Sequence, residues 1–281
     1  MDLNNILPND GPSIEEVQKY IKKYIDDTIV IKCGGSVLVD ENLFKQLIED
    51  LSILNKIGLK IIVVHGGGKN IQKKLNQLNL KSEFINGLRV TDKKLLKVVE
   101  KSLIELNLDI IKQLKSKKCK GISLVADSGI ITVTKISDSL GYVGKPTEID
   151  ISSINKIIKN NEVPVLVPMG MDRNKDKYNI NADIAAGAIA KKINSRRLLL
   201  MTDVPGILDV NKKLIPEIDT KNAENMIINE TITGGMIPKI NTCIDVLNNG
   251  VIGVVIVDGR KPHSILFELF SDKGAGTLIR K

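Results

Sequence analysis

Aromatic residues are scarce in this sequence. Phe, Trp and Tyr make up 3% of the 281 residues, and there is no tryptophan. A hydrophobic content of 42% is still enough for a core, which must be built mainly from aliphatic side chains. The scarcity of aromatics speaks against RNA binding by base stacking. The net charge of +8 does not reverse this, because the lysines are scattered and only 115–120 ("KSKKCK") is dense. We interpret the charge as a solvated surface that favours anionic ligands.

Cysteine and histidine are also scarce. The three cysteines and two histidines show no CxxC or other metal-ligand spacing. This pattern predicts neither a structural zinc site nor a disulfide framework, and it fits a reducing compartment. No apolar run approaches the ~18 residues that would span a membrane, and the start "MDLNNILPNDGPS" does not resemble a signal peptide. We therefore expect a cytoplasmic protein, with the plastid stroma as the alternative, and neither membrane nor nucleic acid as a partner.

Apolar segments of strand length alternate with amphipathic segments of helix length along the chain. Because the strand candidates are apolar throughout, they indicate a parallel sheet covered by helices on both faces. We predict an α/β fold, a three-layer αβα sandwich with a mostly parallel central sheet. The predicted strands are 28–32, 60–64, 163–168, 197–202 and 253–257, and the predicted helices are 42–57, 151–160, 182–193, 235–249 and one opening at 66–71 ("GGGKNI").

Other segments extend this alternation. Residues 13–25 predict an amphipathic helix ahead of the first strand, with Ser13 and Glu16 as a capping box. In the middle, 121–129 and 130–136 have the pattern of strands, and 140–150 ("LGYVGKPTEID") predicts a hairpin-like excursion. We expect an N-terminal extension over 1–26, an N-terminal lobe over 27–170 and a C-terminal lobe over 171–281, the two lobes sharing one sheet.

Glycine-rich or polar clusters follow three of the predicted strands. They are "KCGG" (32–35), "HGGG" (65–68) and "TDVPG" (202–206). Ligands of open α/β sheets bind at the carboxyl ends of the parallel strands. Glycines let the backbone approach an anion there, where N–H groups and a helix N-terminus can bind it. A single cluster is more typical of a tight turn, but several at one edge indicate an anion site.

Two standard nucleotide motifs do not fit. "GYVGKPT" (141–147) is not the end of a P-loop, because Ser139 stands where the earlier glycine is required and Pro146 replaces Ser/Thr. "GGGKNI" lacks the third glycine of a dinucleotide fingerprint, since Ile71 occupies that position. We interpret His65, beside the second cluster, as a structural histidine rather than a base.

Several side chains near the clusters are suited to an anionic ligand. Lys32 ends a strand beside two glycines, and Lys239 lies in another Gly-Gly segment, "TGGMIPKI" (233–240). Arg89 could clamp a carboxylate with two hydrogen bonds or lie on the surface. Asp183 could be only a charge favoured at a helix N-terminus, and Lys239 alone could equally be a surface lysine. Asn179 adds an amide suited to holding a carboxylate or another amide.

Seven segments, in their order and spacing, resemble the amino-acid kinase family and within it the arginine-sensitive acetylglutamate kinases. The resemblance covers nearly the whole chain, from about residue 27 to 280. It rests on the combination, since each segment alone is a weak signal. The segments are "VIKCGGSVL", "IIVVHGGGKNI", "NGLRVTD", "YNINADIAAGAIA", "LMTDVPGIL", "GGMIPKI" and "VDGRKPHSILFELFSDKGAGTLI".

This resemblance implies transfer of the γ-phosphoryl group of ATP, supplied with Mg²⁺, to the side-chain carboxylate of N-acetyl-L-glutamate in arginine biosynthesis. It implies that Lys32 and Lys239 stabilise the transition state and that Asp183 holds both lysines in place. The N-terminal lobe would bind acetylglutamate and the C-terminal lobe ATP, with no dedicated metal ligands. The implied acetylglutamate-binding residues are Gly67, Gly68, Arg89 and Asn179, and the implied residues on the ATP side are Gly34, Gly35, Asp203 and Gly206.

The N-terminal extension and the segment 263–279 resemble those of family members that arginine inhibits. The resemblance implies feedback inhibition by L-arginine, with Glu268 binding the guanidinium group and Gly274 beside the effector. It also implies homodimers that the extension interlocks into a hexamer of three dimers. The alternative is that residues 13–25 pack only on their own subunit. Whether a signalling protein of the PII type binds stays open.

Two positions depart from the family pattern. Cys33 stands where a tyrosine is more common, and Lys69 stands where a proline is expected. Neither change removes a proposed catalytic group, and Lys69 has no role in the implied mechanism. Two other functions stay open. One is another amino-acid kinase, acting on glutamate, aspartate, carbamate or UMP, and the other is a non-catalytic arginine-binding regulatory module on the same fold.

Overall fold

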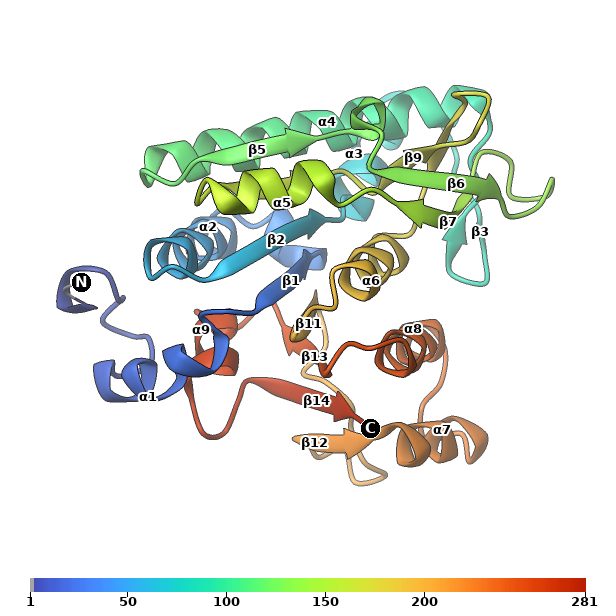
Figure 1. The fold of residues 1–281 in the computed structure, drawn as a ribbon. Helices are drawn as coiled ribbons and strands as arrows, with labels where there is room; N and C mark the ends of the chain where they lie inside the picture. Colours follow the sequence, from blue (N-terminus) through green and yellow to red (C-terminus); the bar gives the residue numbers. More distant parts are fainter. Residues whose placement is uncertain (1–2) are drawn as a thin grey trace.

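The computed structural model describes residues 3–281 (Figure 1). Its centre is an eight-stranded sheet in which all neighbouring strands run parallel except the antiparallel pair β13 and β14. The prediction of a mostly parallel central sheet is therefore confirmed. In spatial order the strands are β12 (Glu217–Asp219), β14 (Gly276–Arg280), β13 (Gly253–Asp258), β11 (Arg197–Thr202), β1 (Thr28–Cys33), β2 (Lys60–His65), β8 (Val163–Leu166) and β5 (Gly121–Leu124).

Helices cover both faces of this sheet, as predicted (Figure 1). Side chains alternate along each strand, so Val30 of β1 belongs to the core on one face while Ile29 and Ile31 belong to the core on the other. One face packs against α5 (Ser152–Lys159), α6 (Ala182–Lys192), α7 (Thr220–Ile228) and α8 (Met236–Asn248). The other packs against α1 (Ile14–Tyr24), α2 (Glu41–Lys56), the C-terminal part of α4 (Lys93–Ser116) and α9 (Ser264–Phe270).

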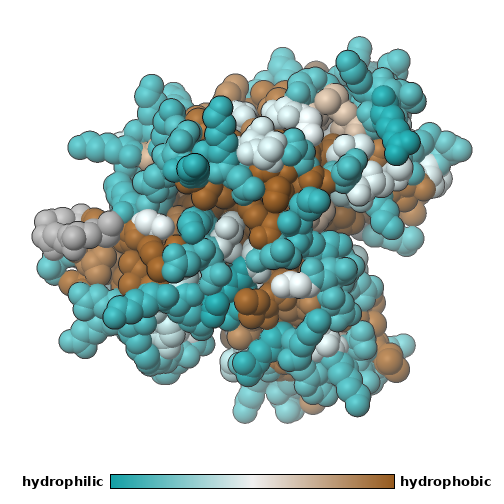
Figure 2. Space-filling view, in the orientation of Figure 1, coloured by the Kyte–Doolittle hydropathy of each residue, from teal (hydrophilic) through white to brown (hydrophobic). Residues whose placement is uncertain are grey.

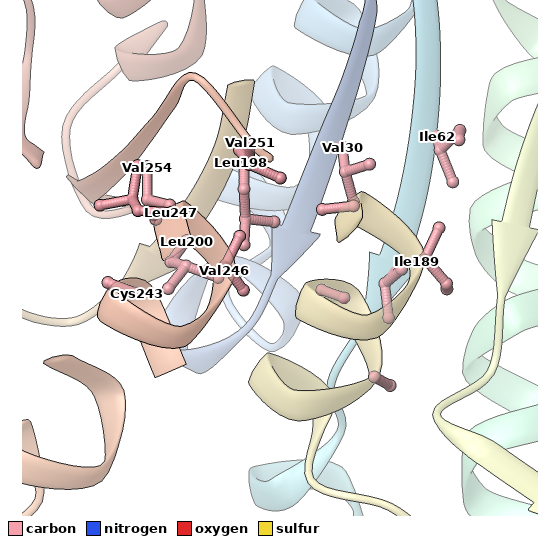
Figure 3. Packing of buried hydrophobic residues seen from close by; sticks show 14 of the residues in the cluster. Val30, Ile62, Ile189, Leu198, Leu200, Cys243, Val246, Leu247, Val251 and Val254 are labelled. Atoms are coloured by element: carbon pink, nitrogen blue, oxygen red, sulfur yellow. The ribbon is translucent and has the colours of Figure 1, made fainter. Parts of the chain in front are cut away.

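The contact between α6 and α8 is close enough to require a glycine. Figure 3 shows Val30, Leu198 and Leu200 of the sheet facing Ile189 of α6 and Val246 of α8. A Cβ atom on Gly187 of α6 would lie 2.9 Å from Cγ2 of Val246. The missing side chain therefore lets the two helices that carry Asp183 and Lys239 lie against each other.

Smaller sheets lie beside the central one and help to frame the ligand site. A four-stranded sheet has the order β10 (Lys177–Asn179), β9 (Met169–Met171), β6 (Ile131–Lys135) and β7 (Gly144–Ile149). The pair β6 and β7 is antiparallel, so the strand predicted over 130–136 and the segment predicted as an excursion over 140–150 together form one hairpin. The remaining short elements are β3 (Phe84–Ile85), β4 (Leu88–Arg89), α3 (Gly68–Gln77), η1 (Leu3–Asn5), η2 (Gly35–Leu38) and η3 (Ala126–Ser128).

The longest helix, α4, is absent from the predicted elements, and so are α7, α9, β12 and β14. The signal for α4 is present in the sequence. Asp92 caps its first turn by accepting a hydrogen bond from the N–H of Leu95 at 2.7 Å. Its buried apolar positions are spaced three or four residues apart, as one helix face requires: Leu96, Val99, Leu103, Leu106, Ile110 and Leu114. Its first half packs on α3 and its second half on the central sheet.

Polar side chains cover most of the face in Figure 2, and the molecule is notched at the right, between the parts that carry β3 and α8. Within residues 3–281, no helix has both the length and the apolar character needed to cross a membrane. The three cysteines, Cys33, Cys119 and Cys243, are buried, and none is paired with another.

A buried histidine links α9 to α2 and to the N-terminal segment. Nδ1 of His263 lies 2.6 Å from Oδ1 of Asp50 in α2, and its Nε2 lies 3.2 Å from Oδ1 of Asp10. The hydrogen bond to Asp50 raises the pKa of His263 despite the opposing effect of burial. Burial raises the pKa of Asp50 itself to about 6.

Replacing Asp50 with asparagine should destabilise the protein most at low pH, because it removes the carboxylate that raises the native pKa of His263. Because this native-state pKa is raised, the stabilisation is fully present below the unfolded value of about 6.5. It is lost as the pH rises through the native pKa of His263. Urea unfolding of the wild type and D50N at several values between about pH 6.5 and 9 measures the difference. A difference in unfolding free energy that is constant over this range would contradict the assignment.

Candidate active site

The carboxyl ends of β1 and β2, which are neighbours in the sheet, border one cavity. Its volume is about 480 Å³. The predicted clustering of glycines at one sheet edge is observed, because the segments after β1 and β2 both line this cavity. The lining includes Lys32, Gly34, Gly35, Gly66, Gly67, Gly68, Lys69, Gln72, Arg89, Asn179, Asn181 and Asp183.

Two lysines from distant parts of the chain meet at one carboxylate. Nζ of Lys32, in β1, lies 3.0 Å from Oδ1 of Asp183, and Nζ of Lys239, in α8, donates a hydrogen bond to Oδ2 of the same residue. The three side chains are only 10–14% exposed. Burial alone would raise the pKa of Asp183, but the two ammonium groups outweigh it and hold that pKa well below its usual range. Asp183 is therefore an anion that fixes two cations beside the cavity.

Asp183 is held by the way in which α6 begins. Asn181 is the N-cap of α6, and its Oδ1 accepts hydrogen bonds from the N–H groups of Asp183 at 2.9 Å and Ile184 at 3.3 Å. An acidic residue in the first turn is also favoured by the helix dipole. Asp183 therefore does lie in the first turn of a helix, as the alternative interpretation of the sequence had it. Its carboxylate, however, binds the two lysines.

The turn after β1 is built around Asp203, the residue that follows β11. Oδ1 of Asp203 accepts a hydrogen bond from the N–H of Ser36 at 2.7 Å. Gly35 has a φ of +79°, and a Cβ atom there would collide with the Asp203 carboxylate. A glycine is therefore required on both steric and conformational grounds. Asp203 does not itself line the cavity, although Gly34 and Gly35 do.

The segment after β2 brings backbone N–H groups to the cavity. Gly67 precedes the first turn of α3, and a Cβ atom on it would lie 2.6 Å from Cδ2 of Leu103 in α4. Gly68, the first residue of α3, has no atom within 4 Å of that position, so it faces open space. The free N–H groups of a helix N-terminus favour an anion at this point.

Arg89 is a nearly buried cation that is held by neutral partners. Its guanidinium group donates to Oγ of Ser82, to Oε1 of Gln72 at 3.2 Å and, more weakly, to the carbonyl oxygen of Gly68 at 3.4 Å. Its Cζ also lies 4.7 Å from the centre of the Phe84 ring. Burial lowers the pKa of Arg89, and within residues 3–281 no carboxylate forms an ion pair with it. Such a group is suited to binding a carboxylate ligand.

His65 is a structural residue, as interpreted from the sequence. It is fully buried, with its Nδ1 2.7 Å from the carbonyl oxygen of Gly66 and its Nε2 3.1 Å from Nδ2 of Asn107. Burial lowers its pKa to about 4, so the ring is neutral at physiological pH. The geometry assigns the proton to Nδ1, which donates to Gly66, and leaves Nε2 to accept from Asn107.

Two of the residues implied for the ATP side, Asp203 and Gly206, lie outside the lining of this cavity. Gly206 has a φ of +142°, and a Cβ atom on it would collide with Oγ1 of Thr277. Asn179 lines the cavity, and its side chain donates a long hydrogen bond, 3.5 Å, to Oγ1 of Thr91. The sequence assigned no role to Lys69, although its place directly after three glycines in a helix start was the signal for one.

A second, smaller cavity of about 200 Å³ lies at the other end of β11. It contains Glu268 and Gly274, the two residues implied for an effector, together with Arg197 at the start of β11. Oε2 of Glu268 accepts a hydrogen bond from the N–H of Ala275 at 2.8 Å, and burial raises the pKa of this carboxyl group. Residues of α1 complete the lining: Tyr20, Lys23 and Tyr24.

Comparison with known proteins agrees with this architecture. An acetylglutamate kinase from Pelagibacter ubique (strain HTCC1062) is 55% identical over 281 residues, covering 100% of this chain and 98% of that one. One from Nitrobacter winogradskyi is 40% identical over 296 residues, covering 100% of this chain and 99% of that one.

The structure of N-acetylglutamate synthase from Neisseria gonorrhoeae, complexed with coenzyme A and N-acetyl-glutamate, has the same fold, with a TM-score of 0.87 at 21% identity. The match covers 95% of this chain and 62% of that one. The model of the amino acid kinase family matches residues 27–258, and the chain belongs to that family.

Proposed function

We propose that this chain is an acetylglutamate kinase. It transfers the γ-phosphoryl group of ATP to the side-chain carboxylate of N-acetyl-L-glutamate and so forms an acyl phosphate. The observation that carries the proposal is the presence of two charged features at one cavity, a pair of lysines on one carboxylate and a separate arginine. Lys32 and Lys239 meet at Asp183, and Arg89 is a buried guanidinium group with neutral partners. The full-length relatives named acetylglutamate kinase support the choice of acceptor.

The chemistry needs charge neutralisation more than proton transfer. The acceptor carboxylate is already a nucleophile, so no general base is required, and the neutral, buried His65 is not in a position to serve as one. Catalysis then consists of alignment and stabilisation of charge on the transferring group. Lys32 and Lys239 supply positive charge, and the N–H groups around Gly34 and at the start of α3 supply hydrogen bonds. Asp183, permanently ionised, fixes the lysines.

Magnesium enters this proposal as part of the nucleotide substrate. Within the described part of the chain, no three His, Cys, Asp or Glu side chains gather into a group that could hold a metal ion. Mg²⁺ typically keeps several waters and binds substrate phosphates with one or two carboxylates. Phosphate oxygens and water would therefore provide most of its ligands here.

Measurement of ADP release with a panel of acceptors tests the proposal. Acetylglutamate should support turnover, and hydroxylamine should trap its acyl phosphate as a hydroxamate. Glutamate, aspartate, carbamate and UMP test the alternative of another amino-acid kinase, and a preference for any of them would overturn the proposal. A protein that binds arginine but releases no ADP with any acceptor would be the non-catalytic regulatory module. The retention of Lys32, Asp183 and Lys239 in one contact argues against that outcome.

The Arg89→Lys variant should bind acetylglutamate more weakly. Lysine keeps the charge but loses the planar fork that pairs with a carboxylate. Loss of a charge-assisted hydrogen bond costs about 1.5–3 kcal/mol, so KM for acetylglutamate should rise roughly 10- to 100-fold.

Initial rates at varied acetylglutamate and at varied ATP separate the two KM values. KM for ATP should stay within about threefold of the wild type, as should both constants in Arg173→Lys, an exposed control. An unchanged KM for acetylglutamate would refute the role of Arg89.

Inhibition by L-arginine is the regulatory part of the proposal. The second cavity supports it, because the carboxyl group of Glu268 and the turn at Gly274 face a space that α1 closes. Titration of activity with arginine up to millimolar concentrations should show inhibition in the wild type and a loss of sensitivity in Glu268→Gln. Activity that arginine does not change would overturn this part while leaving the kinase assignment in place.

We also propose a homo-oligomer, a hexamer of three dimers joined through residues 1–26. In the single chain, α1 packs on α9, and Val17 and Tyr24 of α1 are buried in the core. Its other face, which includes Gln18 and Lys22, is exposed and is available to a second subunit. Deletion of residues 1–25 should convert the hexamer to dimers in sedimentation experiments, and an unchanged assembly would refute the proposed role. Sedimentation of the protein together with a PII-type protein would test whether the two bind.

A further inference from the structure

Among residues 3–281, Lys69 is the one cavity-lining cation that has no role in the proposed mechanism. It lies in the first turn of α3, directly after the three glycines, and its side chain is 49% exposed. Nζ of Lys69 lies 2.6 Å from Oγ of Ser36 and 2.8 Å from Oδ2 of Asp203. This one ammonium group thus joins the segments that follow three adjacent strands: β2, β1 and β11.

The partners of Lys69 are themselves fixed. Asp203 uses its other oxygen, Oδ1, to accept from the N–H of Ser36 at 2.7 Å. That carboxylate also fills the space above Gly35. The bond to Lys69 helps to hold the pKa of Asp203 below its usual value against the effect of burial. Lys69 therefore has two partners of defined position beside the glycine turn, while its side chain stays half-exposed.

An ammonium group has three N–H donors, and protein oxygens occupy two of them. The remaining donor is at a half-exposed group beside Gly34 and Gly35, on the cavity wall. Lysine is a common point-charge binder of phosphate. We propose that Lys69 is a third phosphate-binding cation of this site and contacts the β- or γ-phosphate of ATP. The inference rests on the proposed use of ATP and adds a residue to it.

Calorimetric binding of the Mg²⁺ complex of a non-hydrolysable ATP analogue, without acetylglutamate, tests this role. K69M should bind the analogue roughly tenfold or more weakly than the wild type, whereas K69R should stay within about threefold. AMP lacks both distal phosphates and should bind K69M and the wild type within about twofold of each other. K73M is the matched control, because Lys73 lies exposed in the same helix and its loss changes the net charge equally. It should bind the analogue within about twofold of the wild type.

A double variant separates direct contact from simple neutralisation of Asp203. If Lys69 contacts phosphate, K69M/D203N should still bind the analogue roughly tenfold more weakly than D203N alone. Recovery to the level of D203N would show that Lys69 only balances Asp203, and would overturn the inference. Analogue binding by K69M within threefold of the wild type would also overturn it, as would an equal loss of AMP binding.

Should K69M fail to fold, K69Q provides a second neutral side chain for the same comparison. Because no acceptor is present, the measurement does not depend on acetylglutamate. A chain that bound the analogue through Lys69 but phosphorylated another acceptor would contradict the proposed function and still support this inference.

Discussion

The Lys32→Met variant should turn over about 10²–10³ times more slowly than the wild type while binding ATP almost normally. β1 fixes Lys32 at the cavity, with its Nζ 3.0 Å from Asp183 and 3.5 Å from the carbonyl oxygen of Met201. The charge is therefore in place before the phosphoryl group moves, and it is shielded from bulk water. Loss of one preorganised group of this kind costs about 2.7–4 kcal/mol in the transition state. The expected loss is in kcat rather than in KM.

A coupled assay of ADP release gives kcat, and calorimetry with an ATP analogue gives the affinity. Lys112→Met, at an exposed position of α4, is the matched control, and its kcat should stay within about twofold of the wild type. A Lys32→Met enzyme with near-normal kcat would refute the assigned role. A variant that lost ATP affinity and kcat by the same factor would place Lys32 in ground-state binding instead.

The Asp183→Asn variant should lose stability as well as activity. The substitution leaves the ammonium groups of Lys32 and Lys239, each only 10–12% exposed, with no carboxylate between them. Removing one partner of a buried ion pair costs about 3–5 kcal/mol, because the remaining charge is left uncompensated. Both lysines would also lose their fixed positions. We therefore expect a large drop in the urea midpoint together with a drop in kcat.

Asp245→Asn is the control for this experiment. Asp245 pairs with Lys191 at 2.6 Å, but its side chain is 55% exposed. A surface pair of this kind contributes about 0–1 kcal/mol, so the urea midpoint should hardly move. Equal effects of the two substitutions on stability would show that the Lys32–Asp183–Lys239 contact contributes no more than a surface ion pair.

Much of this site could be predicted from the sequence because its positions are set by local chemistry. Gly34, Gly35 and Gly68 had to follow apolar strands, and the carboxyl ends of parallel strands meet at one edge. Lys32 was recognisable as a charge that a buried strand would not otherwise carry. The fold class followed from the alternation of apolar and amphipathic segments, since strands buried on both faces are apolar throughout.

Other parts depended on pairings between distant residues. The sequence does not indicate that Lys69 would meet Asp203, 134 residues away, or that Gly206 would pack on Thr277. Both depend on the relative positions of neighbouring strand ends, which no local pattern encodes. The omission of α4 is different. Its apolar spacing is regular, but many lysines lie between the apolar positions and dilute the hydrophobic signal.

β11 runs from the smaller cavity toward the larger one. Its first residue, Arg197, lines the smaller cavity, and its last, Thr202, lies two residues beyond Leu200, which pairs with Lys32. Six strand residues span roughly 17 Å, because each step along a strand advances about 3.3 Å. A molecule seated at Arg197 is therefore too far away to occupy the space of either substrate. Any effect it has on phosphoryl transfer is therefore indirect, and it does not require the molecule to take the place of the acceptor.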